Sequence, residues 1–223
     1  MTATGNPVIQ WSWISQNASA IWSALGQHAE LSGIAVGVGF AIALPVSLFV
    51  WRFSRARGTV IAFAGLLYTI PSIALFAILQ PITGFFTITT AEVALVSYTQ
   101  LVLIRNIVTG LDEVPPEVRE AARAMGYSPV AEFFNVDLPL ATPAIIAGLR
   151  VATVTVVGLV NVTAFIGLGG LGQFIIQGFQ ENGFQTPIIV ALVLSIALAG
   201  LADLFLVGVQ HFVVRWNRAP TRA

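Results

Sequence analysis

The sequence contains no cysteine and no lysine, and charged residues make up only 9% of its 223 positions. Without cysteine the chain can form neither a disulfide nor a thiolate metal site. Without lysine it has no P-loop, so it does not bind ATP by that route. His28 and His211 have no partner at metal-ligand spacing, and we expect interfacial polar residues rather than a metal site. No Ser/His/Asp or paired-carboxylate arrangement indicates hydrolytic chemistry.

The chain is instead rich in long apolar stretches. Hydrophobic residues make up 57% of the sequence and the mean hydropathy is +0.87, whereas a soluble domain is about 25% charged. This composition predicts an all-α polytopic membrane protein. Five stretches approach the ~20 residues that a helix needs to cross a bilayer, and Pro71 near the middle of the second predicts a bend there. They are residues 32–50, 60–79, 91–110, 144–166 and 188–210.

The segment before the first stretch carries neither Lys nor Arg, so we infer no secretory signal in it. Its Trp11, Trp13 and Trp22 favour an interfacial helix over residues 11–27 on the outer face, with the tryptophans at headgroup level, and a disordered tail is the alternative. Whether residues 11–27 form an additional membrane helix is left open. The predicted organisation is an external segment 1–28, a transmembrane domain 29–212 that includes a polar loop 112–140, and a cytoplasmic tail 213–223.

The basic residues fix the predicted topology. All ten are arginine, and the five-span arrangement places them on or near one side, which the positive-inside rule makes cytoplasmic. The N-terminus is then outside and the C-terminus inside. Outside lie only Glu30, Glu92 and Glu181. The arginines are Arg52, Arg55, Arg57, Arg105, Arg119, Arg123, Arg150, Arg215, Arg218 and Arg222.

The one long polar interruption lies between the third and fourth stretches. Pro116 suits the start of a helix and Gly126 its left-handed stop, which predicts a first short helix over about residues 116–125. Ser128 can cap a second short helix, which Pro139 should end. The sequence therefore predicts two short helices joined by a tight turn, on the cytoplasmic side.

One face of the first short helix carries mostly small side chains, which would let another surface approach its backbone. The alternative is an amphipathic loop with no special role. Glu120-Ala121-Ala122, then Gly126, then Val136-Asp137-Leu138-Pro139 resemble the EAA loop of binding-protein-dependent ABC importer permeases, with Val136 where isoleucine is usual. That resemblance implies that the loop docks into a cytoplasmic ATPase subunit. The coupling residues would be Val118, Glu120, Ala121, Ala122, Met125, Gly126, Leu138 and Pro139.

Three further segments narrow the resemblance, which covers about residues 30–212. Residues 69–75, 111–114 and 165–172 are similar to the osmoprotectant subfamily, whose substrates are glycine betaine, carnitine, choline and proline betaine. Importers of another small solute such as methionine share a similar glycine-rich turn and remain an alternative. A secondary transporter or channel, or a membrane scaffold, fits the polar loop less well.

The resemblance also implies partners. The chain would be a non-catalytic permease subunit in the inner membrane, surrounded by lipid and forming half of a pore with a second permease copy or paralogue. Two ATPase subunits would bind ATP and Mg²⁺, and a separate extracytoplasmic binding protein would deliver the solute. No nucleic-acid partner is implied, and the chain itself would hold no cofactor.

Residues 167–172 spell the G-x-G-x-x-G pattern of dinucleotide sites, but they follow a membrane span rather than a strand, so that interpretation fails. A flexible or closely packed external turn fits better. Pro71 and Ser72 at the bend, with Gly169 in the turn, are candidates for the solute path or its gate. The alternative for all three is helix packing by small residues.

Two charges are predicted inside the membrane. Arg150 lies about two turns from the cytoplasm in the fourth stretch, and Asp203 lies at comparable depth in the fifth. Because a buried charge is normally paired, we predict that they form an ion pair or share a polar cavity. Two separate charges that reach toward water are the alternative.

Overall fold

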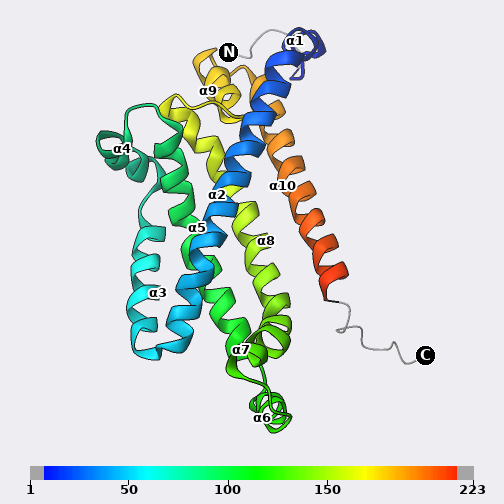
Figure 1. Cartoon of the computed structure of the whole chain (residues 1–223). Helices are drawn as coiled ribbons and strands as arrows, with labels where there is room; N and C mark the ends of the chain where they lie inside the picture. Colours follow the sequence, from blue (N-terminus) through cyan, green and yellow to red (C-terminus); the bar gives the residue numbers. More distant parts are fainter. Residues whose placement is uncertain (1–7, 215–223) are drawn as a thin grey trace, which may run out of the picture.

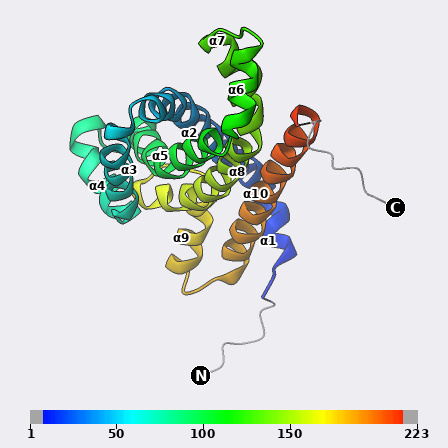
Figure 2. The ribbon, with the colours of Figure 1, turned by 90° about the horizontal axis from the view of Figure 1, so that it is seen from below.

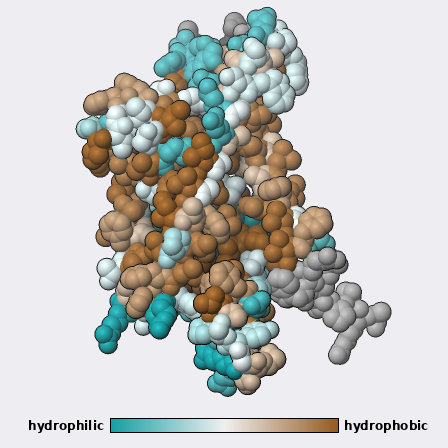
Figure 3. All heavy atoms as spheres, in the orientation of Figure 1, coloured by the Kyte–Doolittle hydropathy of each residue, from teal (hydrophilic) through white to brown (hydrophobic). Residues whose placement is uncertain are grey.

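A computed structural model describes residues 8–214 (Figure 1). Within this range the chain is helical and contains no strand. Four helices are long and apolar enough to cross a membrane, or five spans if the bent pair α3–α4 counts as one. Apolar residues dominate the middle of the molecule and polar residues gather toward its two ends (Figure 3). The all-α, multi-span architecture predicted from composition is confirmed.

The first long helix begins earlier than the sequence analysis placed it. A short helix α1 spans Trp11–Gln16, and α2 then runs without interruption over Ala18–Arg52. The region 11–27 is therefore not one separate interfacial helix, because its second half forms the first turns of α2. Burial explains this extension, since Ile21 and Ala24 pack with residues of α9 (Gly172–Gln180) and α10 (Gln185–Val213) in one apolar cluster.

The second predicted span is divided at its proline. Helix α3 (Ser54–Thr69) and helix α4 (Ser72–Thr83) meet at an angle of 100°. Ile70 leaves the helix in an extended conformation, which a following proline favours. The hydroxyl of Tyr98 on α5 (Ile88–Asp112) donates to the Ile70 carbonyl, which satisfies a backbone group that the break sets free. The bend at Pro71 is confirmed, but it is sharper than a kink within one continuous helix.

The centre of the bundle is formed by α2, α5 (Ile88–Asp112) and α8 (Leu138–Thr163), which pack along two apolar clusters. Small residues let α5 and α8 approach closely. A Cβ atom added at Gly148 of α8 would lie 2.5 Å from the Cβ of Asn106 on α5. A side chain at position 148 would therefore force the two central helices apart.

The remaining helices lie at the ends and side of this centre. After α8, the short helix η2 (Ala164–Ile166) and the glycine-rich turn lead to α9 (Gly172–Gln180) and then to α10 (Gln185–Val213). Figure 2 shows α3 and α4 on one side of the bundle and α10 on the opposite side. Many large apolar residues of α10 are exposed, so α10 contacts the rest of the protein through only part of its own surface.

The polar segment between α5 and α8 forms helices α6 (Pro116–Ala124) and α7 (Pro129–Glu132), followed by a π-helical turn η1 (Phe133–Asp137). The turn continues directly into α8, so the prediction that Pro139 ends a helix is wrong. The N–H of Leu138 reaches back five residues to the Phe133 carbonyl, and Pro139 follows in the first turn of α8. Proline is tolerated there because it needs no N–H partner.

Candidate functional site

A proline begins helix α6 and a glycine ends it. Pro116 occupies its first turn, and Gly126 follows it with φ of +87°. The N–H groups of Gly126 and Tyr127 donate to the carbonyls of Arg123 and Ala122, the pattern of a Schellman stop. A Cβ atom at Gly126 would meet nothing within 4 Å, so the requirement for glycine here is one of backbone conformation rather than space. The short helix predicted over about residues 116–125 is thus present.

The small-residue face of α6 is divided by the fold. Ala122 is buried, whereas Val118, Ala121 and Met125 are exposed, with Met125 exposing 70% of its surface. Glu120 is exposed beside them. Three other large side chains of the polar segment are also exposed, although the sequence analysis did not assign them to docking. They are Tyr127, Val130 and Phe134.

The spacing of Val130 and Phe134 by four residues puts both on one side of a helix, which is the sequence signal that could have identified them. Leu138, by contrast, packs against the inner apolar cluster. Pro139 lies half-buried at the start of α8. These two predicted coupling residues therefore lie where the polar segment joins α8. The exposed residues lie instead on α6, at Tyr127 and on α7–η1.

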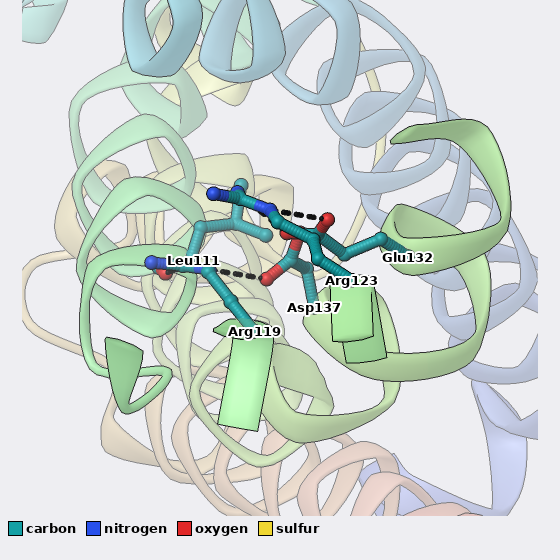
Figure 4. Close-up of polar contacts among 5 residues, drawn as sticks. All are labelled: Leu111, Arg119, Arg123, Glu132 and Asp137. Atoms are coloured by element: carbon teal, nitrogen blue, oxygen red, sulfur yellow. Dashed lines mark hydrogen bonds and ion pairs between the residues drawn. The ribbon is translucent and has the colours of Figure 1, made fainter. Parts of the chain in front are cut away.

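Arg119 connects α6 to three other elements, and Figure 4 draws its partners in α5 and η1. Its Nε donates to Oδ1 of Asp137 in η1 at 2.7 Å, and its Nη2 donates to the Leu111 carbonyl at the end of α5 at 2.6 Å. Its guanidinium also lies 5.5 Å from the ring centroid of Trp51 near the end of α2, a cation–π distance. The Asp137 side chain is only 4% exposed and that of Arg119 19%. The sequence did not indicate this connection, because its partners lie at separated positions.

A second arginine joins α6 to α7. Nε and Nη2 of Arg123 each donate to one carboxylate oxygen of Glu132 at 2.8 Å. These hydrogen bonds lower the pKa of Glu132, so this carboxylate remains ionised at neutral pH. Glu132 lies near the start of the continuous helical run formed by α7, η1 and α8. This run is longer than the ~20 residues that a bilayer requires, so its polar first turns extend beyond the membrane. The pair holds the two short helices as one unit.

The opposite end of the molecule contains the glycine-rich turn. The N–H of Gly170 donates to Oε1 of Gln27 at 3.2 Å, and the N–H of Leu171 donates to Nδ1 of His28 at 3.3 Å. His28 Nε2 in turn lies 2.9 Å from the Val157 carbonyl. His28 is fully buried, so the expectation of an interfacial histidine is wrong, and pairing of both ring nitrogens explains why burial is tolerated.

The turn is closely packed rather than open. A Cβ atom at Gly169 would lie 2.1 Å from Oε1 of Gln27. Pro71 caps α4 and Ser72 begins it, at the break with α3. Ile70 beside this break and Leu168 beside Gly169 pack against the same apolar cluster, so the two predicted gate regions border one shared core. Whether any of the three acts as a gate stays a prediction.

The structure brings Arg150 and Asp203 together. Nε of Arg150 donates to Oδ1 of Asp203 at 2.7 Å, and Nη2 donates to Oδ2 at 2.9 Å. Their side chains are 35% and 28% exposed, so the pair is only partly covered. Within residues 8–214 no group of three His, Cys, Asp or Glu side chains is placed to hold a metal ion.

Residues 33–214 match the family model described as binding-protein-dependent transport system inner membrane component. The chain belongs to this family. It is therefore a multi-pass permease component of a transport system that works with an ATPase and a binding protein. The coupling segment predicted from the EAA resemblance is the polar segment α6–η1, at one end of the bundle.

Curated permeases resemble the chain in sequence, and a solved structure shares its fold. The choline transport system permease protein OpuBB of Bacillus subtilis is 34% identical over 78% of this chain and 82% of its own length. The glycine betaine/carnitine/choline permease OpuCB of the same organism is 32% identical over 84% and 89%. An inward-facing structure of the MetNI methionine ABC transporter matches with a TM-score of 0.80 and 24% identity over 89% of this chain and 98% of that one.

Proposed function

We propose that this chain is the membrane-spanning subunit of an ATP-driven importer for small solutes that carry a quaternary ammonium group, such as glycine betaine, carnitine, choline or proline betaine. The observation that supports the solute class is the 32–34% identity, over most of both chains, to permeases whose names specify choline, carnitine and glycine betaine. Glycine betaine, carnitine and choline share a quaternary ammonium group, which a protein can attract by cation–π contacts and by carboxylates. A separate binding protein would make the primary selection of the solute.

The proposed assembly contains two permease subunits and two ATPase subunits. The ATPases would bind ATP and Mg²⁺ and carry out hydrolysis, and this chain would be non-catalytic. The N-terminus would lie outside and the C-terminus in the cytoplasm. In this arrangement the exposed apolar side chains Met125, Val130 and Phe134 would contact the ATPase, since they belong to the polar segment whose helices α6 and α7 lie at one end of the bundle (Figure 1). The predicted tail arginines Arg215, Arg218 and Arg222 lie outside the described residues.

The contacts of Arg119 suggest how movement would be transmitted. Closure of the ATPase dimer would displace α6, and Arg119 would transfer the displacement to α5, η1 and α2 through the Leu111 carbonyl, Asp137 and Trp51. Moving a two-state population from 1:99 to 99:1 takes about 5.5 kcal/mol. The permease would take this free energy from its partner, because a conformational shift requires differential binding to the two states.

Uptake by the purified complex tests the proposal. The permease, its ATPase, any second permease and the binding protein encoded beside it are reconstituted in proteoliposomes, and uptake of labelled glycine betaine is measured with and without internal ATP. We expect ATP-dependent accumulation that excess choline or carnitine reduces.

Three outcomes of the same experiment separate the alternatives. Uptake that needs no ATP would favour a secondary transporter. Inhibition by methionine but not by choline would favour an amino-acid importer, an alternative compatible with the fold shared with the methionine transporter. An ATPase that responds only to a binding protein loaded with another solute would keep the importer architecture and remove the osmoprotectant assignment.

A further inference from the structure

The Arg150–Asp203 pair lies deep within the membrane-crossing helices. Arg150 is about 18 Å along α8 from its first residue, and Asp203 is about 15 Å from the inner end of α10, at 1.5 Å per residue. Both hydrogen bonds of the pair are at charge-assisted distances. The two helices thus present a pair of opposite charges near mid-membrane.

The pair is open on one side. A groove of about 440 Å³ adjoins it, lined also by Ala147, Val151, Val154 and Thr155 of α8. Charged side chains within membrane helices face a protein interior or a water-filled cavity rather than lipid. With about a third of each side chain exposed, the groove is therefore a surface that another protein subunit or water covers.

The neighbouring surface of α8 supports this assignment. Although α8 is a central helix, Ala147, Val151, Val154 and Gly158 form an exposed stripe along it. A Cβ atom at Gly158 would meet nothing within 4 Å. These short side chains leave the ion pair reachable from the groove. A lipid-facing surface would not need such an opening beside a charged pair.

We propose that this groove is a solute-contact site within the translocation path, an inference that rests on the proposed function. The guanidinium of Arg150 contacts the carboxylate of a zwitterionic solute, and the carboxylate of Asp203 contacts its trimethylammonium group. When the site is empty the two side chains neutralise each other, so neither charge is left without a partner. A zwitterionic solute supplies a carboxylate to Arg150 in place of Asp203, and an ammonium group to Asp203 in place of Arg150. The site therefore stays neutral.

Because the natural chain contains no cysteine, single-cysteine variants test the site directly. Thr155→Cys places a thiol in the groove, and Leu201→Cys places one on an exposed surface of α10 two residues, or about 200° of helix rotation, from Asp203. The reagent is a methanethiosulfonate that carries a trimethylammonium group, applied to the reconstituted complex.

We expect the reagent to label T155C and not L201C, because a permanently charged reagent reaches a thiol in a water-filled groove but not one on a lipid-facing surface of α10. Glycine betaine at about ten times its dissociation constant should slow labelling about tenfold, since only the unoccupied fraction reacts. Sucrose of equal osmolarity should give no protection. Absence of labelling at T155C, or labelling that glycine betaine does not slow, would overturn the site. Uptake of glycine betaine by the unaltered complex is measured in parallel, so that failure of the proposed function is seen separately.

A charge exchange distinguishes solute contact from a structural role. The variant R150D/D203R retains an ion pair with reversed orientation. We expect it to copurify with the ATPase and to respond to loaded binding protein, while uptake of glycine betaine falls about tenfold or more, the loss expected for one charge-assisted hydrogen bond. Full uptake by the exchanged pair would show that only pairing matters and would overturn the proposal. If the exchanged variant fails to assemble, the labelling of T155C and its protection decide alone.

Discussion

Replacing Arg119 with methionine should separate ATPase docking from transport. Methionine keeps much of the side-chain length but removes the guanidinium, which leaves the Asp137 carboxylate, only 4% exposed, and the Leu111 carbonyl without this donor. Breaking a buried ion pair by removing one partner costs ~3–5 kcal/mol. The exposed face of α6 is unchanged, so the ATPase should still copurify while solute uptake per ATP hydrolysed falls.

The double variant R119M/D137N provides the internal comparison. It removes the stranded charge, and we expect it to recover most of the thermal stability that R119M loses but not the ratio of uptake to hydrolysis. Glu117→Gln, on the exposed first turn of the same helix, is the control for loss of one charge from α6. The reasoning is refuted if R119M has both normal stability and normal uptake, or if R119M/D137N restores coupling.

Three further changes test the fold and the coupling segment. Gly126→Arg should uncouple transport while the protein stays in the membrane, because φ of +87° costs a side-chain-bearing residue ~1–2 kcal/mol; uptake and ATPase assays check this. Tyr98→Phe removes the hydrogen bond to the Ile70 carbonyl and should lower stability by ~1 kcal/mol in thermal unfolding. Gly172→Ala should destabilise by ~1–3 kcal/mol, since its Cβ would lie 2.1 Å from a backbone carbonyl of α8. Gly33→Ala, which meets nothing, should not destabilise, and equal unfolding temperatures for the two alanine variants would contradict the packing argument.

The sequence correctly predicted the structural features that depend on a single residue or on one continuous stretch of the chain. Apolar length identified the membrane helices, Pro71 identified the break between α3 and α4, and Gly126 identified the end of α6. In each case the decisive property belongs to one residue or one stretch. A missing N–H, a left-handed backbone or a long apolar run acts in the same way whatever lies nearby.

The sequence-based predictions that were wrong concern features that depend on contacts between residues far apart in the chain. The second half of the region 11–27 belongs to α2 because α9 and α10 cover it, and His28 is buried because Leu171 and Val157 pair with its ring. The continuous run from α7 into α8 depends on a π-helical turn, for which the sequence offered no sign beyond Pro139 itself. Arg119 was counted as a cytoplasmic charge, whereas three elements determine its role.

The chain has few charged side chains, and several of them form contacts between different helices. Relative movement of those helices would be transmitted through these contacts. Arg119 joins α6 to α2, α5 and η1, and Arg57 joins α3 to Asp112 at the end of α5 at 2.7 Å. We therefore expect a displacement of α6 to act directly on α2, α5 and η1, and on α3 through α5. Helix α10 packs mainly on α8 and α9, and Arg150–Asp203 connects it to α8 near mid-membrane. Relative movement between α10 and the rest would act directly on that pair, which places the proposed solute contact where a change of state would open or close it.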